Sequence, residues 1–158
     1  MGVEIERKFL PASEGWRGLG EPTLMRQGYL CSDPVRTVRV RIEGERAVIT
    51  IKSKSTGATR GEWEYEIPVP DAAELLGRLC EQPLVEKIRH RIVYGRHTWE
   101  VDEFLGGNAG LVVAEIELGS EDETFDRPDW IGREVTGDPR YYNSSLIRLP
   151  YSTWKDQA

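Results

Sequence analysis

The chain has 158 residues, of which 30% are charged and 39% are hydrophobic, and its formal net charge is −6. This length suits one domain with a sizeable core, and the composition is typical of a folded chain rather than a disordered one. The acidic balance gives no general attraction for nucleic acid, so any anion-binding site must be local.

The sequence lacks the features of exported or membrane-bound proteins. No apolar stretch approaches the ~18 residues of a membrane span, and charges begin at Glu4, which does not suit a signal peptide. Cys31 and Cys80 are too few for a disulfide framework and have no metal-ligand spacing. We therefore expect a cytoplasmic protein made of one domain over residues 1–158, either a monomer or a homodimer, with no membrane or nucleic-acid partner.

Alternating apolar and polar residues, separated by turn residues, predict eight strands in chain order. Gly44 separates the third strand from the fourth and Gly95 separates the sixth from the seventh, so both pairs are expected to be hairpins. The predicted strands cover residues 3–9, 25–31, 37–43, 46–54, 61–69, 85–94, 97–104 and 111–118.

A helix is predicted over residues 71–80, between the fifth and sixth strands. Pro70 precedes it, and Asp71 is a suitable N-cap. Its expected apolar stripe consists of three leucines: Leu75, Leu76 and Leu79.

Two further short helices are expected after the last predicted strand. Ser120 and Glu123 have the spacing of a capping box. Asp138 followed by Pro139 is typical of the first turn of a helix, which would run toward Leu149. Eight strands joined mostly by hairpins, with few and short helices, favour a mainly β (α+β) fold with an antiparallel barrel or sandwich.

Charged residues occupy positions i and i+2 in seven of the predicted strands, so they share one face of each strand. Apart from Lys8, each row carries a single sign. The basic rows are Arg39 and Arg41; Lys52 and Lys54; and Lys87, Arg89 and Arg91, whereas the acidic rows are Glu4 and Glu6; Glu62, Glu64 and Glu66; Glu100 and Asp102; and Glu115 and Glu117.

This segregation of charge costs stability unless a ligand compensates it. Like charges about 7 Å apart repel by roughly 0.6 kcal/mol in water and about 2.4 kcal/mol at an effective dielectric near 20. Divalent cations compensate clustered carboxylates, and phosphates compensate clustered Lys and Arg. Because an eight-stranded barrel can hold one small ligand, we predict a barrel whose charged interior is a wet tunnel, with the apolar faces packed outside.

The stretch Glu4-Ile5-Glu6-Arg7-Lys8, followed in order by the rows above, closely resembles the CYTH domain family, also called the triphosphate tunnel metalloenzymes. The resemblance covers essentially the whole chain, including residues 137–143. It implies an eight-stranded antiparallel barrel that binds a triphosphate and a divalent metal inside. The acidic row of Glu62, Glu64 and Glu66 is longer than the family pattern requires, and this is the clear departure from that pattern. Glu66 is expected at the rim of the tunnel.

The resemblance and the ligand chemistry together suggest roles for these rows. Glu62 and Glu64 are open between a second metal, orientation of water and a structural role, and Arg91 is expected near the tunnel mouth. The expected ligands of Mg²⁺ or Mn²⁺ are Glu4, Glu6, Asp102, Glu115 and Glu117, and the expected phosphate ligands are Lys8, Arg39, Arg41, Lys52, Lys54, Lys87 and Arg89.

Lys8 is also a candidate catalytic base, because several surrounding cations would lower its pKa. The resemblance implies that Lys8 and Tyr29 activate water together, although Tyr29 can equally be a half-buried strand aromatic. His90 and His97 are interpreted as structural, and the glycosylation sequon that begins at Asn143 is interpreted as coincidence.

The leading functional hypothesis is metal-dependent hydrolysis of a triphosphate, with inorganic tripolyphosphate as the best substrate. A class IV adenylate cyclase and a thiamine triphosphatase are the enzymatic alternatives, and a polyphosphate- or nucleotide-binding module is the non-enzymatic one. The many carboxylates favour an enzyme, since a polyanion-binding module needs only cations. The sequence leaves open the physiological substrate, the preferred metal and whether the last helix plugs the tunnel.

Overall fold

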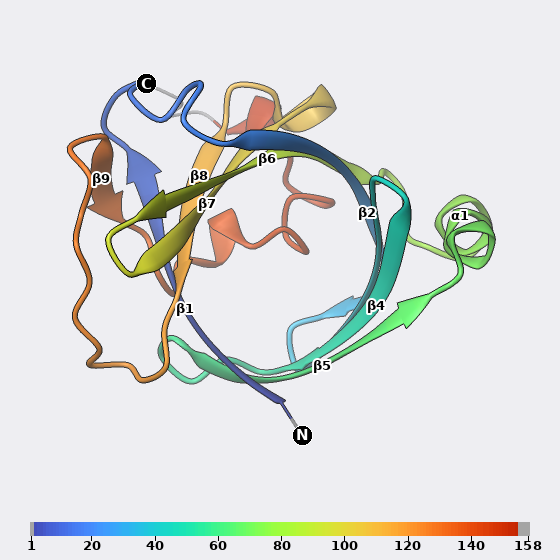
Figure 1. Ribbon diagram of the computed structural model, residues 1–158. Helices are drawn as coiled ribbons and strands as arrows, with labels where there is room; N and C mark the ends of the chain where they lie inside the picture. Colours follow the sequence, from blue (N-terminus) through green and yellow to red (C-terminus); the bar gives the residue numbers. More distant parts are fainter. Residues whose placement is uncertain (1, 155–158) are drawn as a thin grey trace.

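Nine antiparallel strands form one sheet, and eight of them close into a barrel in the computed structural model (Figure 1), as the sequence predicts. The structure describes residues 2–154. Around the barrel the order is β1–β5–β4–β3–β2–β6–β7–β8 and back to β1. The strands are β1 (Gly2–Pro11), β2 (Glu21–Asp33), β3 (Arg36–Glu43), β4 (Arg46–Ser53), β5 (Thr59–Ile67), β6 (Val85–Tyr94), β7 (His97–Phe104), β8 (Val112–Glu117) and β9 (Ile131–Glu134).

Strand β1 closes the barrel by pairing with different strands along its length. Residues 2–5 pair with β5, and residues 6–9 pair with β8. The short strand β9, which the sequence did not indicate, pairs with the last residues of β1. The charged residues of β1 therefore lie where the two ends of the sheet meet.

Helix α1 (Val69–Arg78) packs on the outside of the barrel against β2, β3 and β4 (Figure 1). It begins two residues earlier than predicted, so Pro68 is the N-cap and Asp71 lies in the first turn, where its charge suits the helix dipole. Leu76 is buried as expected, but Leu79 is 66% exposed because the helix has already ended.

The two later helices predicted from the sequence do not form as such. Residues 119–128 contain no helix, and Glu123 instead accepts a hydrogen bond from the backbone N–H of Gly119 and contacts His97. Asp138 does cap the backbone N–H of Arg140, but only the 3₁₀ turn η2 (Pro139–Tyr141) follows, because Tyr142 returns to an extended conformation. The other 3₁₀ turns are η1 (Gly106–Asn108) and η3 (Tyr151–Thr153).

The hydrophobic core lies outside the barrel wall, as three clusters. One contains Phe9, Trp99 and two tryptophans from the connecting loops, Trp16 and Trp130. A second lies between the barrel and the C-terminal segment, and a third lies under α1. Because the apolar faces of the strands point outward, the inward faces are free to carry charge, as the alternation predicts.

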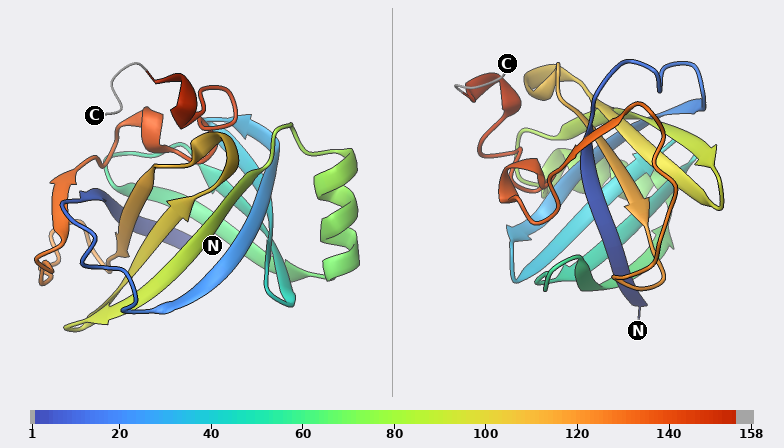
Figure 2. Two further views of the ribbon diagram at one scale, coloured as in Figure 1. Left: turned by 90° about the horizontal axis from the view of Figure 1, so that it is seen from above. Right: turned by 90° about the vertical axis from the view of Figure 1, so that its left-hand side faces the viewer.

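Residues 139–154 lie across one end of the barrel (Figure 2). Tyr141, Leu146 and Ile147 anchor this segment by packing in the second cluster. The tunnel end is therefore covered by turns and 3₁₀ helices rather than by the predicted helix. Within residues 2–154, no helix is long and apolar enough to cross a membrane.

Candidate functional site

The barrel encloses a cavity of about 250 Å³ with an almost entirely polar wall. Its wall comes from all eight barrel strands and from the C-terminal segment. It is lined by Glu4, Glu6, Lys8, Tyr29, Thr37, Arg39, Arg41, Glu43, Arg46, Thr50, Lys52, Arg60, Glu62, Glu64, Lys87, Arg89, Arg91, Glu100, Glu115, Glu117, Tyr142, Asn143 and Ser144.

The order of the strands divides this cavity into two halves of opposite charge. Strands β7, β8, β1 and β5 are consecutive around the barrel, as are β4, β3, β2 and β6. We call the first set the acidic half, although Lys8 and Arg60 lie on it, and the second the basic half. Lining carboxylates of the acidic half are Glu4, Glu6, Glu62, Glu64, Glu100, Glu115 and Glu117, and lining cations of the basic half are Arg39, Arg41, Arg46, Lys52, Lys87, Arg89 and Arg91.

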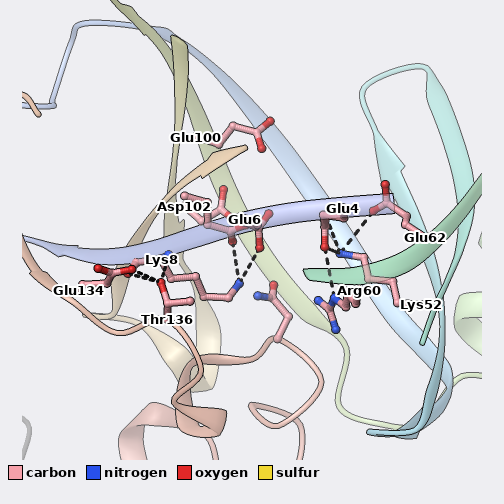
Figure 3. A network of polar contacts seen from close by, with 12 residues as sticks. Glu4, Glu6, Lys8, Lys52, Arg60, Glu62, Glu100, Asp102, Glu134 and Thr136 are labelled. Atoms are coloured by element: carbon pink, nitrogen blue, oxygen red, sulfur yellow. Dashed lines mark hydrogen bonds and ion pairs between the residues drawn. The ribbon is translucent and has the colours of Figure 1, made fainter. Parts of the chain in front are cut away.

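Lys8 lies between two carboxylates of the acidic half (Figure 3). Its Nζ is 3.1 Å from Glu6 Oε1 and 3.4 Å from Glu115 Oε1. Burial alone would lower the pKa of Lys8, but the charges of Glu115 and Glu6 outweigh it and raise the pKa above its ordinary value. The expectation that neighbouring cations lower this pKa is therefore wrong, because β1 pairs with acidic β8.

A second group of charges surrounds Glu4 (Figure 3). Lys52 Nζ donates to Glu4 Oε1 at 3.0 Å, and Arg60 Nε donates to the same oxygen at 3.2 Å. Burial opposes ionisation of Glu4, but these two cations prevail and lower its pKa to about 2. Burial and the negative charge of Glu4 raise the pKa of Glu62 to about 7.

The carboxyl groups of the acidic half occur in close pairs. The negative charge of Glu6 opposes ionisation of Glu115, and that of Glu4 opposes ionisation of Glu62. Burial, followed by the charge of Glu6, raises the pKa of Glu115, and burial with the charges of Glu4 and Glu6 raises that of Glu117. In the part of the chain that the structure describes, no three Asp, Glu, His or Cys side chains are already grouped as a metal site.

Arg39 and Arg41 of β3 make only long contacts with carboxylates, since Arg39 Nη2 is 3.8 Å from Glu64 Oε2 among the described residues. Arg39 Nη2 donates to Thr50 at 3.3 Å, and Arg41 Nη2 is 3.7 Å from Glu43. The Nε atoms of both arginines are buried and have no hydrogen-bond partner among residues 2–154. Burial and the charges of Arg39 and Arg89 lower the pKa of Arg41 to about 10. These guanidinium groups therefore retain capacity for an anionic acceptor.

Asp102 lies behind the cavity wall and does not line it. Its side chain is fully buried and accepts from Arg89 Nε and Nη2 at 2.8 and 2.9 Å, while Lys87 Nζ is 2.7 Å away. Burial opposes its ionisation, but the charges of Arg89 and Lys87 hold the pKa of Asp102 well below its usual range. The structure thus places Asp102 as a partner of two basic-half cations, and its charge also contributes, after burial and the charge of Glu6, to the raised pKa of Glu115.

The CYTH domain family model matches residues 2–145 of this sequence. The chain belongs to the CYTH domain family. An inorganic triphosphatase from Acetivibrio thermocellus is 52% identical over 99% of this chain and 100% of its own length. An inorganic triphosphatase from Nitrosomonas europaea is 38% identical over 91% of this chain and 96% of its own length.

Solved structures share the fold of this CYTH domain. A crystal structure of an inorganic triphosphatase has 36% identity and a TM-score of 0.64, and the match covers 90% of this chain and 96% of that chain. A conserved hypothetical protein from Pyrococcus furiosus has 20% identity and a TM-score of 0.59, with 75% of this chain and 80% of that chain covered. At 20% identity, the match to the Pyrococcus furiosus protein shows a shared fold and nothing more.

Most of the site residues predicted from the sequence lie at the cavity of this CYTH domain. Besides Asp102, the exception is Lys54, which is exposed because β4 ends at Ser53. Tyr29 lines the cavity and is 5% exposed, although no hydrogen bond joins it to Lys8 among the described residues. Arg60 and Asn143 line the cavity without having been predicted.

Proposed function

We propose that this protein hydrolyses inorganic tripolyphosphate to pyrophosphate and orthophosphate with the help of a divalent cation. The observation that carries the proposal is the meeting of an acidic and a basic half across one cavity of about 250 Å³. The two relatives named inorganic triphosphatase, matched over nearly their whole lengths, support this choice of reaction.

The acidic half fits a divalent cation by its chemistry. The close Glu6–Glu115 pair, with Glu117 opposite Glu6 in the register of β1 and β8, offers carboxylate oxygens whose repulsion a cation would relieve. Such a pair suits Mg²⁺ or Mn²⁺, which usually take a few carboxylates and complete their shell with phosphate oxygens and water. We propose these three glutamates as ligands, with Glu4 and Glu62 beside them. The cation would neutralise charge on the phosphates.

The basic half would hold the phosphate chain. Arg39 and Arg41 offer planar guanidinium groups suited to two-point contacts with phosphate, and Lys52 offers a point charge. Lys87 and Arg89 line the same half but share their charge with Asp102. We therefore assign the strongest phosphate contacts to the β3 arginines, whose buried Nε atoms lack acceptors within the described chain.

Lys8 is proposed to act as a cation during the reaction. Its raised pKa keeps it protonated near neutral pH, so it would stabilise charge on the transferred phosphoryl group rather than remove a proton from water. Tyr29 lines the same cavity and would help to orient the attacking water through its hydroxyl group. Phosphoryl transfer is catalysed almost entirely by positioning of the reactants and by neutralisation of charge, so it does not require Lys8 to act as a base.

The cavity wall favours a substrate made only of phosphate. Recognition of a base or a thiamine ring usually needs an apolar or aromatic platform. Trp63, Tyr65 and Trp99 do not line the cavity, and its aromatic lining residues are Tyr29 and Tyr142. We therefore propose that tripolyphosphate is preferred over ATP and thiamine triphosphate, in a cytoplasmic protein that is a monomer or a homodimer.

A comparison of the three triphosphates at equal Mg²⁺ or Mn²⁺ concentration tests the proposal. Phosphate release should be fastest with tripolyphosphate, and mass spectrometry of the ATP reaction should show no cyclic AMP. A tenfold higher kcat/KM for thiamine triphosphate, equivalent to ~1.4 kcal/mol, would assign the protein as a thiamine triphosphatase instead. Cyclic AMP would assign a cyclase, and binding without any turnover would assign a polyphosphate-binding module.

A further inference from the structure

Asn143 brings a neutral amide from the C-terminal segment to the charged cavity. It lines the cavity together with Tyr142 and Ser144. Its position is fixed by the packing on either side, because Tyr141 is 4% exposed and Leu146 is fully buried in the cluster outside the barrel. Asn143 therefore sits on an anchored turn rather than on a loose end.

The orientation of the Asn143 side chain follows from its partners. Lys87 Nζ is 2.8 Å from Asn143 Oδ1, and Gln27 Nε2 is 2.9 Å from the same oxygen. An ammonium group can only donate, so the atom facing Lys87 must be the carbonyl oxygen and not the amide nitrogen. Both buried donors thus hold the oxygen, and the NH₂ group is turned away from them.

The Nδ2 amide of Asn143 makes no hydrogen bond to any residue that the structure describes, yet the residue lines the cavity. This nitrogen is a donor without an acceptor in the described chain, in a residue whose side-chain oxygen is held by Lys87 and Gln27. A phosphate oxygen is the acceptor that the proposed substrate would supply.

We propose that Asn143 is a substrate-binding residue that donates a hydrogen bond from Nδ2 to an oxygen of the bound phosphate chain, with Gln27 and Lys87 as the residues that orient it. This inference rests on the proposed function. It gives the C-terminal segment a direct role in the site, so that segment is part of the phosphate-binding surface as well as a cover for the barrel end.

Three single variants of the full chain separate this role from a structural one. Asn143→Asp keeps an oxygen that accepts from Lys87 and Gln27 but removes the donor, whereas Asn143→Ala removes both. Ser144→Asp places the same added charge on the neighbouring cavity residue. The measurements are the melting temperature without ligand, the dissociation constant of inorganic tripolyphosphate in metal-free buffer, and KM and kcat with Mg²⁺.

Asn143→Asp should melt close to the wild type, because its oxygens preserve the contacts with Lys87 and Gln27. Its affinity for tripolyphosphate should fall by about tenfold to a hundredfold, the range for loss of a hydrogen bond to a charged group. Asn143→Ala should also lose about tenfold, and Ser144→Asp should lose less than Asn143→Asp.

A purely structural role predicts different results. If Asn143→Ala binds tripolyphosphate as the wild type does, and Asn143→Asp loses no more affinity than Ser144→Asp, the inference is wrong. Failure of the wild type to bind tripolyphosphate would instead refute the proposed function, and this inference with it. Hydrogen exchange of residues 139–147 provides an independent reading, because tripolyphosphate should slow exchange there in the wild type and not in Asn143→Ala.

Discussion

The two halves of the cavity differ in how completely the protein compensates their charges. The acidic half contains its own cations, since Lys8 lies between Glu6 and Glu115 and Arg60 reaches Glu4. The β3 arginines of the basic half have buried Nε atoms without acceptors in the described chain. An anionic ligand would supply acceptors to these arginines, whereas a cation would relieve the carboxyl groups of Glu62, Glu115 and Glu117, whose pKa values burial and neighbouring carboxylates raise.

The difference also separates cations that are available to a ligand from cations that are already paired with a carboxylate of the protein. Arg89 belongs to the basic half, but Asp102 neutralises it with two hydrogen bonds. Arg41 is similarly buried, and within residues 2–154 its ion-pair partner is the carboxylate of Glu43 at 3.7 Å. Two cations of like burial are thus expected to respond differently to a ligand, and each half can be tested by removing one charge.

The largest effect on stability is expected for Asp102→Asn, which removes the acid that compensates the basic half. Arg89 and Lys87 would remain buried without their main counter-charge, which typically costs ~3–5 kcal/mol. Urea denaturation measures this loss. Glu100→Gln is the matched control on the same strand, because Glu100 also contacts Arg89 but is partly exposed, and it should change the free energy of unfolding by ~1 kcal/mol or less. Equal losses of unfolding free energy in the two variants would show that Asp102 stabilises the buried cations no more than Glu100 does.

Glu115→Gln tests whether the acidic half serves catalysis. We expect kcat for tripolyphosphate to fall by roughly a hundredfold or more, equivalent to ~2.7 kcal/mol in the barrier. The melting temperature without metal should hold or rise, because a carboxylate is removed from a repelling pair. Glu66→Gln, which changes an exposed acid paired with Arg46, should leave both unchanged. Normal turnover in Glu115→Gln would contradict the proposed metal site.

Arg41→Ala tests the unequal compensation directly. Loss of this buried guanidinium should weaken tripolyphosphate binding by about tenfold or more. Lys54→Ala is the control, because Lys54 has the same charge and lies in the same run of predicted ligands, but outside the cavity. The tripolyphosphate-induced rise in melting temperature measures both. A similar loss in both variants would mean that overall charge, and not the cavity, governs binding.

The smallest expected effect is a pH dependence from Glu62. An unfolded glutamate titrates near 4.5, but folded Glu62 titrates at about 7. Between these values the folded state binds a proton that the unfolded state has lost, so raising the pH through this window lowers stability. The melting temperature without ligand should therefore fall from pH 5 to pH 8. Glu62→Gln should make this fall shallower, and an unchanged slope would contradict the assignment.

The sequence predicts the barrel and the faces of its strands because side-chain direction in a strand has a strict period of two. The same rule fails where a strand ends. Lys54 was expected beside Lys52, but β4 stops at Ser53. Arg60 was missed because the fifth strand was begun at Gly61, whereas β5 begins at Thr59 and Arg60 shares the face of Glu62.

Other parts of the site depend on distances that periodicity does not encode. Alternation places Asp102 on the inward face but does not indicate its depth behind Lys87 and Arg89. Lys8 was assigned cationic neighbours because strand order was unknown, yet the register sets Lys8 opposite Glu115. Asn143 follows a 3₁₀ turn, where no repeating pattern indicates which side chains face inward.

The way in which β1 seals the barrel has a consequence for folding. Its partners lie far along the chain: Glu4 contacts Arg60, and Arg7 contacts Glu134, 127 residues away. Contacts of such large sequence separation form late, because the chain between them must first be ordered. Strand β1, which carries Glu4, Glu6 and Lys8, is thus expected to join the barrel last. The hairpin of β3 and β4, which holds the arginines that we propose bind phosphate, forms from local contacts, so we expect affinity for polyphosphate to arise during folding before the capacity to cleave it.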